Sequence, residues 1–323
     1  MKGRKKVRAI ALLSSGIDSA IAVRLMMEQD IELTAVNFVT PFSNEKKDYA
    51  GNLADQLGVR LIRVELGDDY ISLIKKPKHG YGCNMNPCVD CRIYMLSEAK
   101  RIAKQVGAGF IVTGDVLGER PMSQNKSALD IEDDEAGVGG YVLRPLSARL
   151  LPQTFPEVWG WVDRSRLLAL KGRSRKPQLD LGKRLGISEY RTPSGGCLLT
   201  TKEFSQKLGE LFSYKDDVTV LDIKRLRLGR HFFLPSSEII VGRNEDENRI
   251  LWDCKYHNDY IFQTPDCPGP VTLLTGSKDE EAVKLAARLT AKYSDAGTEY
   301  VPVQYRMNGK RENILVEPQS GDE

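Results

Sequence analysis

Residues 7–19 read Val-Arg-Ala-Ile-Ala-Leu-Leu-Ser-Ser-Gly-Ile-Asp-Ser, and this stretch decides the fold class. Residues 7–13 form a short apolar run, which is typical of a buried strand in a parallel sheet. The small polar residues after it predict a tight turn. Residues 17–29 then carry apolar side chains at helical spacing. A strand, a turn and a helix in this order predict the first unit of an α/β fold.

The same alternation continues along the first half of the chain. Strands are predicted at 33–39, 59–65 and 109–113, and helices at 48–57, 92–106, 176–185 and 202–211. Such alternation predicts a parallel sheet that is covered by helices on both faces. Residues 123–140 combine a run of acidic residues with glycines and are predicted to form a mobile surface loop.

The length and a change in composition predict two domains. A chain of 323 residues is longer than one typical hydrophobic core requires. The composition changes near residue 213, so we expect domains at 1–212 and 213–323. The second is predicted to be a smaller α+β domain, with strands at 218–223, 238–241 and 271–274 and a helix at 280–292.

The bulk composition is that of a globular protein, with 41% hydrophobic and 28% charged residues. No apolar run is long enough to span a membrane, and nothing resembles a signal peptide. We therefore expect a cytoplasmic protein with no membrane partner, as a monomer or a homodimer.

Two stretches, 164–176 and 224–231, carry several basic residues and no acidic one, although the net charge is only +3. They are either solvated surfaces or sites for an anionic partner such as RNA. The candidates for RNA binding are Arg164, Lys171, Arg173, Arg175, Lys176, Arg227, Arg230 and, later in the chain, Arg243.

The turn from Ser14 to Ser19 has the chemistry of a phosphate site. Small residues let backbone amides approach a ligand, and the start of the following helix adds free N–H groups and a favourable dipole. Hydroxyl groups supply further donors, and Asp18 is placed to hold a magnesium ion. The alternative is an ordinary helix cap, because serine and aspartate are favoured there in any case.

Three of the six cysteines cluster at Cys83, Cys88 and Cys91, and Cys197 stands in a glycine-rich turn. Cys88 and Cys91 form a Cys-x-x-Cys pair just before a predicted helix, where the helix dipole favours thiolates. Zinc sites, redox dithiols and iron–sulfur clusters all use this pair. Two buried structural cysteines are the remaining alternative.

Several motifs in order resemble a known superfamily. The segment Ser-Ser-Gly-Ile-Asp-Ser at 14–19 resembles the loop of the PP-loop ATP pyrophosphatases, with Ser15 where glycine is usual. Asn-Pro-Cys-Val-Asp-Cys at 86–91, Val-Thr-Gly-Asp at 112–115 and Ser-Gly-Gly-Cys-Leu-Leu at 194–199 follow it. This order resembles the tRNA-thiolating branch, that is, the 2-thiouridine synthases of the MnmA type and the 4-thiouridine synthases. Asp115 replaces a histidine of that pattern.

The resemblance implies a HUP-like fold, Mg²⁺ and ATP cleavage that adenylates a uridine carbonyl oxygen before sulfur replaces it. It implies that ATP is bound by Ser14, Ser15, Gly16, Asp18, Ser19, Phe38, Thr113 and Gly114. The residues implied in catalysis are Asp18, Cys88, Cys91 and Cys197.

Two sulfur mechanisms stay open at this point. In the preferred one, Cys88, Cys91 and Cys197 bind a [4Fe-4S] cluster, with zinc or no metal as alternatives. In the other, one cysteine carries a persulfide that a second resolves. Cys83 is either a fourth ligand or a sulfur carrier. The implied partners are tRNA and a sulfur donor, which is sulfide, a cysteine desulfurase or a sulfur carrier.

Residues 220–305 resemble the NFACT-type RNA-binding module, through Gly242-Arg243-Asn244 with Asn248 and through Pro268-Gly269. Arg243 and nearby aromatic residues suit an RNA surface: Phe232, Phe233, Tyr256, Tyr260 and Phe262. A purely structural domain is the alternative. For the whole chain, the alternatives to a tRNA thiouridine synthase are a PP-loop ligase or amidotransferase for a small molecule and a non-catalytic RNA-binding protein.

Overall fold

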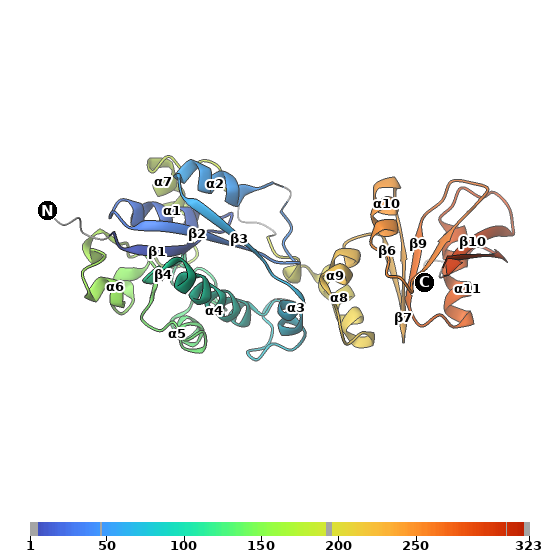
Figure 1. Ribbon diagram of the computed structural model, residues 1–323, viewed down its shortest axis with the longest axis horizontal. Helices are drawn as coiled ribbons and strands as arrows, with labels where there is room; N and C mark the ends of the chain where they lie inside the picture. The colour runs from blue at the N-terminus through green and yellow to red at the C-terminus, as the bar shows by residue number, and fades with distance from the viewer. Residues whose placement is uncertain (1–5, 46, 192–195, 308, 320–323) are drawn as a thin grey trace. The chain divides into compact units, whose positions relative to one another are not determined.

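The computed structural model describes residues 6–45, 47–191, 196–307 and 309–319. The chain divides into two compact units, Met1–Thr200 and Thr201–Glu323 (Figure 1). The predicted boundary between residues 212 and 213 falls inside helix α8 (Lys202–Tyr214) and is corrected here. This helix packs on α9 (Val220–Leu226) and on β6 (Arg230–Leu234), so the whole helix belongs to unit 2.

Unit 1 is built on a five-stranded sheet in the order β3-β2-β1-β4-β5, and every paired neighbour is parallel. The strands are β1 (Arg8–Leu12), β2 (Glu32–Val39), β3 (Arg60–Glu65), β4 (Phe110–Val112) and β5 (Val142–Leu143). The predicted α/β class with a parallel sheet is therefore confirmed.

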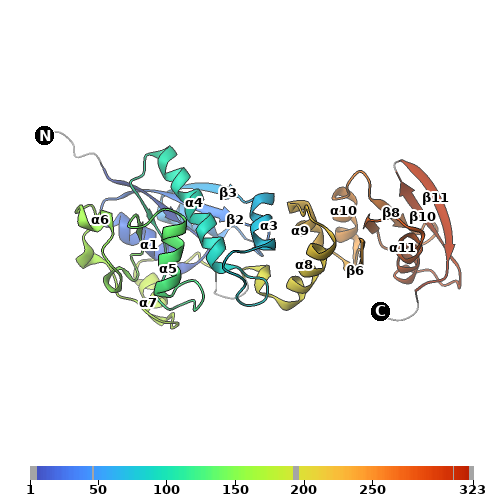
Figure 2. The same ribbon diagram turned by 90° about the horizontal axis from the view of Figure 1, so that it is seen from below.

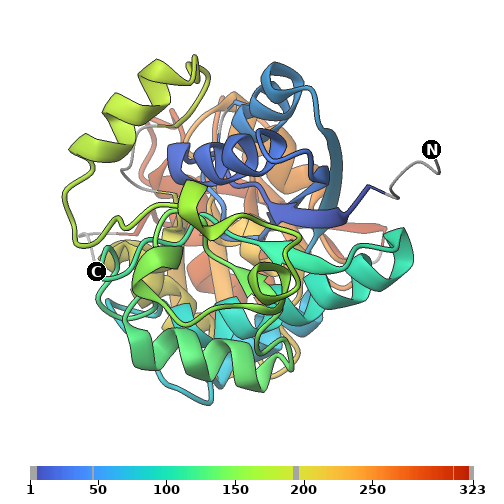
Figure 3. The ribbon, with the colours of Figure 1, turned by 90° about the vertical axis from the view of Figure 1, so that its left-hand side faces the viewer.

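Helices cover both faces of this sheet (Figures 1 and 2). Ala9 and Ala11 of β1 pack against the side of α1 and α2, whereas Ile10 and Leu12 pack against α4. This split follows from the alternation of side chains along a strand. The helices are α1 (Ile17–Met27), α2 (Tyr49–Leu57), α3 (Asp68–Lys75), α4 (Cys88–Val106), α5 (Lys126–Glu135), α6 (Phe155–Val158) and α7 (Lys176–Arg184). Figure 3 faces the end of unit 1 that carries α6.

Two sequence-based expectations for unit 1 are corrected. The predicted loop at 123–140 contains helix α5, which Asn125 caps by accepting a hydrogen bond from the Ala128 N–H at 2.9 Å. Ala128 and Leu129 are buried, so packing rather than composition stabilises this acidic helix. Helix α4 begins at Cys88, which puts both cysteines of the pair inside its first turn.

Unit 2 contains a six-stranded antiparallel sheet in the order β11-β10-β8-β9-β7-β6. Its further strands are β7 (Ser237–Val241), β8 (Tyr260–Gln263), β9 (Thr272–Gly276), β10 (Val301–Met307) and β11 (Lys310–Val316), and its further helices are α10 (Glu245–Asp253) and α11 (Glu280–Lys292). Helix α11 packs on one face of the sheet and α10 on the other. The predicted α+β domain is confirmed.

The strand predicted at 218–223 is wrong, because most of that segment is the start of α9. Thr219 and Asp222 cap this helix reciprocally: each side chain accepts a hydrogen bond from the other residue's backbone N–H. This capping box is a signal for a helix start that outweighs the β-branched residues nearby.

Candidate active site

A cavity of about 340 Å³ lies at the carboxyl ends of β1, β2 and β4. Parallel α/β sheets bind ligands at this edge, because the loops that follow neighbouring strands meet there. The cavity brings together most of the predicted site residues: Ser14, Gly16, Asp18, Ser19, Phe38, Cys88, Cys91, Thr113, Gly114, Arg175 and Cys197. Ser15 does not line it, and its hydroxyl donates to Glu45 instead.

The loop from Ser14 to Ser19 is fixed by its own hydroxyl groups. The Ser14 N–H donates to Ser19 Oγ at 3.1 Å, and Ser19 Oγ donates to the Gly16 carbonyl oxygen at 2.8 Å. The cap of α1 is Gly16, and no side chain accepts a hydrogen bond there. The alternative of an ordinary side-chain cap therefore does not describe this helix start.

Two glycines shape the cavity in different ways. A Cβ atom on Gly114 would lie 2.5 Å from the Ser19 nitrogen, so only glycine lets the end of β4 pack on the loop. A Cβ atom on Gly16 would meet only Ser14 Oγ, at 3.4 Å. The space beside Gly16 is therefore open to a ligand, as a phosphate-binding loop requires.

Asp18 is the carboxylate that faces this loop, and Arg175 holds it. Arg175 Nη2 lies 2.9 Å from Asp18 Oδ2 and 2.8 Å from Glu119 Oε1. Asp18 Oδ1 is buried and has no hydrogen-bond partner within the described residues. Burial and the nearby Glu119 charge raise the pKa of Asp18 to about 6, against the effect of Arg175. An unsatisfied oxygen of this kind can accept a cation or a donor from a ligand.

This position corrects the interpretation of Arg175 as one of a row of surface cations. Its neighbours Lys171, Arg173 and Lys176 are exposed, but Arg175 turns into the cavity. Arg164 is also engaged within unit 1: it binds Glu157 at 2.5 Å and the Leu151 carbonyl oxygen at 2.9 Å.

Asp115, which stands where the resembled pattern has histidine, is a buried structural residue. It accepts hydrogen bonds from Arg92 at 2.5 Å, from Thr113 at 2.7 Å and from Gln124 at 3.1 Å. Burial alone would raise the pKa of Asp115, but Arg92 and Arg144 outweigh it and lower the pKa to about 2. Asp115 thus holds Thr113 at the edge of the cavity.

Sequence reasoning missed Glu119 and Arg120 as residues of this cavity. Both line it, and the Arg120 side chain has no ion-pair partner within the residues that the structure describes. The available signal was the turn at 118–124, in which Arg120 stands between Glu119 and Pro121 close after the motif at 112–115. The buried Arg144, directly after β5, binds Asp133 of α5 through two hydrogen bonds of 2.7 and 2.8 Å.

The three predicted sulfur-handling cysteines face the same cavity from two sides. Cys88 and Cys91 come from the first turn of α4, and Cys197 lies in a segment that pairs with residues 42–44. Tyr70 Oη donates to Cys91 Sγ at 3.0 Å. The motif residues Ser194 and Gly195 lie outside the described residues.

The expectation that the helix dipole favours thiolates here is corrected. Burial raises the pKa of Cys91 to about 12, and it also raises the pKa values of Cys88 and Cys197. Each thiol therefore holds its proton unless a cation takes the proton's place. Within the described parts of the chain, no group of three or more His, Cys, Asp or Glu residues is arranged around a single metal ion. Cys83 is exposed and does not line the cavity.

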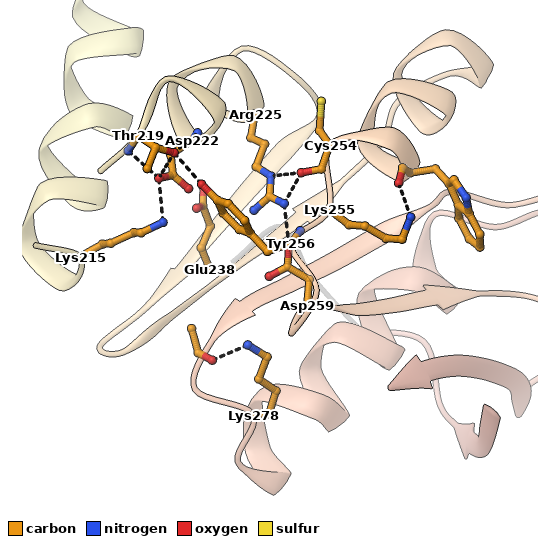
Figure 4. A network of polar contacts seen from close by, with 12 residues as sticks. Lys215, Thr219, Asp222, Arg225, Glu238, Cys254, Lys255, Tyr256, Asp259 and Lys278 are labelled. Atoms are coloured by element: carbon orange, nitrogen blue, oxygen red, sulfur yellow. Dashed lines mark hydrogen bonds and ion pairs between the residues drawn. The ribbon is translucent and has the colours of Figure 1, made fainter. Parts of the chain in front are cut away.

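In unit 2, one arginine of the basic stretch 224–231 is buried inside the domain. Arg225 is buried, donates to the Cys254 carbonyl oxygen and to Asp259 Oδ2 at 2.6 Å, and stacks on Tyr256 at 4.1 Å (Figure 4). Phe262, predicted for the RNA surface, is fully buried as well. In the basic segment 224–231, Lys224, Arg227 and Arg230 are therefore exposed, whereas Arg225 is not.

The segment from Gly242 to Asn248 has a clear local role. Asn244 caps α10 by accepting from the Glu247 N–H at 3.0 Å, and Asn248 Oδ1 accepts from the Val271 N–H at 3.0 Å. Glu247 binds the exposed Arg243 side chain and accepts from the Gly229 N–H. Arg243 is thus exposed but already paired with a carboxylate.

Arg227 and Arg230 are exposed, and Arg230 lies over the Tyr293 ring at 4.4 Å. None of the helices in the described residues is both long and apolar enough to cross a membrane.

Comparison with known proteins gives separate matches for the two units. Residues 5–149 match the family model described as Thiamine biosynthesis protein (ThiI), and residues 229–323 match the one described as NFACT protein RNA binding domain. A probable tRNA sulfurtransferase of Thermococcus kodakarensis is 35% identical over 122 residues, which cover 35% of this chain and 30% of that protein. A probable tRNA sulfurtransferase of Alkaliphilus metalliredigens is 30% identical over 143 residues, which cover 44% and 36%.

The chain thus spans about a third of the length of these curated relatives. Among solved structures, a 4-thiouridine synthetase–RNA complex with bound ATP is 19% identical, with a TM-score of 0.38 over 68% of this chain and 52% of that one. The U34-tRNA thiolase NcsA from Methanococcus maripaludis, with its [4Fe-4S] cluster, is 16% identical, with a TM-score of 0.39 over 64% and 66%. By sequence, unit 1 is thus similar to the ThiI family over residues 5–149, and unit 2 is similar to the NFACT-type RNA-binding domain over residues 229–323.

Proposed function

We propose that this protein is an ATP-dependent tRNA thiouridine synthase. One observation carries the proposal: a single cavity joins the loop at Ser14–Ser19 to Cys88, Cys91 and Cys197, which lie far apart in the sequence. A phosphate-binding loop beside three thiols suits a reaction in which ATP activates an atom that sulfur then replaces. The curated relatives of unit 1 carry the name tRNA sulfurtransferase.

The first step is the adenylation of a uridine carbonyl oxygen. That oxygen attacks the α-phosphate of ATP, and pyrophosphate leaves. The open space at Gly16 and the start of α1 receive the phosphates, and Asp18 with its unpartnered oxygen holds Mg²⁺. Arg120, which has no ion-pair partner within the described residues, is placed to neutralise charge that develops on the phosphate.

The second step replaces the activated oxygen. Hydrosulfide attacks the same carbon, the bond to oxygen breaks, and AMP leaves with that oxygen. The uridine must leave its base stack to reach the cavity. Cys88, Cys91 and Cys197 lie where this attack takes place, and the donor is free sulfide or a sulfur-carrying protein.

The chemistry of the three thiols fits a [4Fe-4S] cluster. Cys88, Cys91 and Cys197 would hold it, and no fourth cysteine among the described residues lines the cavity. When bound, such a cluster supplies an iron without a protein ligand, to which sulfide can bind. Buried thiols with raised pKa values become thiolates when iron replaces their protons. Tyr70 adds a hydrogen bond to the sulfur of Cys91.

RNA binding is assigned to unit 2 and to the exposed cations of unit 1. Arg227, Arg230 and Arg243 contribute from unit 2, and Lys171, Arg173 and Lys176 from the segment that leads to Arg175. Their charges attract the phosphates of tRNA without reading its sequence.

The test is thiolation of tRNA by the full chain, reconstituted with iron and sulfide without oxygen and supplied with ATP and sulfide. We expect thiouridine in the digested tRNA together with AMP. Cys197→Ser should abolish thiouridine and lower bound iron, whereas the matched variant Cys83→Ser should keep both. Thiouridine made by iron-free protein would favour the persulfide route. AMP formed without any thiouridine would overturn the proposal in favour of a PP-loop ligase.

A further inference from the structure

A second cavity, of about 290 Å³, lies at the opposite end of β4 from the active site. Gly109 and Phe110, where β4 begins, line it, whereas Thr113 and Gly114, after the strand ends, line the active-site cavity. Tyr141 lines the second cavity as well. Figure 3 faces this end of unit 1.

Aromatic rings gather beside this second cavity. Tyr141 lies 4.8 Å from Phe155, which stacks on Trp159 at 5.2 Å with an interplanar angle of 13°. Trp161 continues the group at 4.6 Å from Trp159. We call these four residues the aromatic cluster. Tyr141, Phe155 and Trp159 are exposed by 41%, 39% and 47%, which is unusual for adjacent large rings on one surface.

The backbone is shaped to hold these rings. A Cβ atom on Gly140, whose φ is 75°, would lie 2.7 Å from the Phe155 ring. A Cβ atom on Gly109 would lie 2.8 Å from the Trp161 ring. The Phe155 N–H also donates to the Gly140 carbonyl oxygen at 2.8 Å. The rings therefore keep their positions while their outer surfaces stay exposed.

The charge around the second cavity is positive. Lys100 and Lys104 of α4 line it, and no acidic residue belongs to its described lining. Neither lysine has an ion-pair partner within the described residues. Glu157 in α6, the acidic residue nearest to the rings in sequence, is buried and bound by Arg164.

We propose that the aromatic cluster, with Lys100 and Lys104, binds an unpaired nucleotide of RNA. A nucleotide offers a flat base for an exposed ring and a phosphate for an ammonium group, which is the pairing that single-stranded RNA sites use. A cavity of about 290 Å³ admits a single nucleotide but no double helix. The inference rests on the proposed function in one respect only, that RNA is the substrate.

Tryptophan fluorescence of the full chain tests this site directly. The chain has three tryptophans, so a Trp252→Phe background leaves Trp159 and Trp161 as the only emitters. Quenching then reports on a base beside these rings and not on RNA bound elsewhere. We expect saturable quenching by a single-stranded uridine hexanucleotide and little by an RNA duplex of the same length.

Three variants in that background separate stacking from general apolar contact. Trp159→Leu keeps an apolar side chain without a ring and should weaken binding of the hexanucleotide about 10-fold. Trp159→Phe should retain most of the affinity. Val158→Ala, at a neighbouring residue that is 62% exposed, is the matched control and should bind like the parent. Replacing both lysines by glutamine should make binding less dependent on salt.

Two outcomes would overturn the inference. One is the absence of saturable quenching by the hexanucleotide. The other is unchanged RNA binding by Trp159→Leu together with quenching by an acidic peptide such as hexaglutamate, which would assign the surface to a protein partner. Thiolation of tRNA is measured in parallel. Active protein without quenching would refute only this site, and quenching by inactive protein would refute only the proposed function.

Discussion

Two arginines, one in each unit, each bind an aspartate, but they lie in different surroundings. Arg175 reaches into the active-site cavity and lies between Asp18 and Glu119. Arg225 is enclosed in unit 2, where Asp259, the Cys254 carbonyl oxygen and the Tyr256 ring surround it. The side chain of Arg175 is 24% exposed and that of Arg225 only 2%.

This difference separates a pair that a ligand can open from a pair that the fold requires. Asp18 keeps one oxygen without a partner, and the cavity beside it admits water, a cation or a phosphate. Arg225 and Asp259 are almost completely enclosed, although each keeps one buried atom without a partner among the described residues, and Arg225 ties α9 to the segment before β8. A basic residue can thus be exposed to solvent, form an ion pair that a ligand opens, or be buried in the core. Its surroundings in the fold decide which of these applies.

Substitution of the two arginines by methionine should lower the free energy of unfolding by different amounts. Arg225→Met leaves Asp259 buried without its partner and should lower the free energy of unfolding by about 3–5 kcal/mol. Arg175→Met should lower it by about 1–3 kcal/mol, because water in the cavity can solvate the two carboxylates. Urea unfolding, followed by circular dichroism, measures both.

Added MgATP should affect the stability of these two variants differently. It should restore the stability of Arg175→Met, because the ligand supplies new partners for Asp18 and binds only the folded state. It should leave the deficit of Arg225→Met unchanged. Equal stability losses, or equal rescue of both variants, would contradict the distinction between the two sites.

The next largest effect concerns catalysis by Asp18. Asp18→Asn removes the charge proposed to hold Mg²⁺ and should slow AMP formation about 10²–10³-fold, while binding of tRNA stays unchanged. Production of labelled AMP and filter binding of tRNA measure the two quantities. Ser15→Gly is the matched control in the same loop, because Ser15 does not line the cavity and should leave the rate close to that of the parent. A parallel loss of tRNA binding in Asp18→Asn would refute the assigned role.

A smaller effect concerns pH. The two aspartates of this cavity, Asp18 and Asp115, should make the free energy of unfolding depend on pH in opposite directions. The pKa of Asp18 is raised to about 6, so the folded state holds this proton more tightly, and stability falls as pH rises from about 4 to 6. The pKa of Asp115 is lowered to about 2, so its stabilisation is complete above about pH 4 and is lost as pH falls toward 2.

Unfolding without Mg²⁺ over pH 2–7 separates the two aspartates. The stability of Asp18→Asn relative to the parent should increase by about 2–3 kcal/mol between pH 4 and 6. Asp115→Asn should be less stable than the parent above pH 4 and should approach it near pH 2. The same pH trend in both variants would contradict their different surroundings.

Much of unit 1 was predictable because local pattern and tertiary structure agree there. The strand before Ser14, the loop and the helix after it follow from residues 7–29, and the parallel sheet follows from their repetition. Cys197 was singled out by its motif, and the structure brings it to the cavity that Cys88 and Cys91 also line.

The errors arose where packing, which a sequence pattern does not display, decides the outcome. The acidic segment at 126–135 is a helix because Ala128 and Leu129 are buried. Arg225 looked like one of several surface cations, but Tyr256 and Asp259 enclose it. The thiols of α4 were expected to ionise at a helix start, yet burial outweighs the dipole there. For Arg225 the deciding groups are about 30 residues away in the sequence.

The smallest expected effect comes from Glu247, the carboxylate that pairs with the exposed Arg243. Glu247 binds the Arg243 side chain and accepts from the N–H groups of Gly229 and Arg243. In Glu247→Gln the amide oxygen can still accept from these N–H groups, but the negative charge beside Arg243 disappears. The exposed ion pair contributes little, so stability should change by less than about 1 kcal/mol. Arg243 then presents an uncompensated charge, and tRNA should bind a few-fold more tightly with a steeper dependence on salt. Asp246→Asn, which removes an exposed carboxylate of the same helix that pairs with Arg249, is the control for a general change in charge. Weaker binding by Glu247→Gln would mean that the carboxylate positions Arg243 for RNA instead of competing with it.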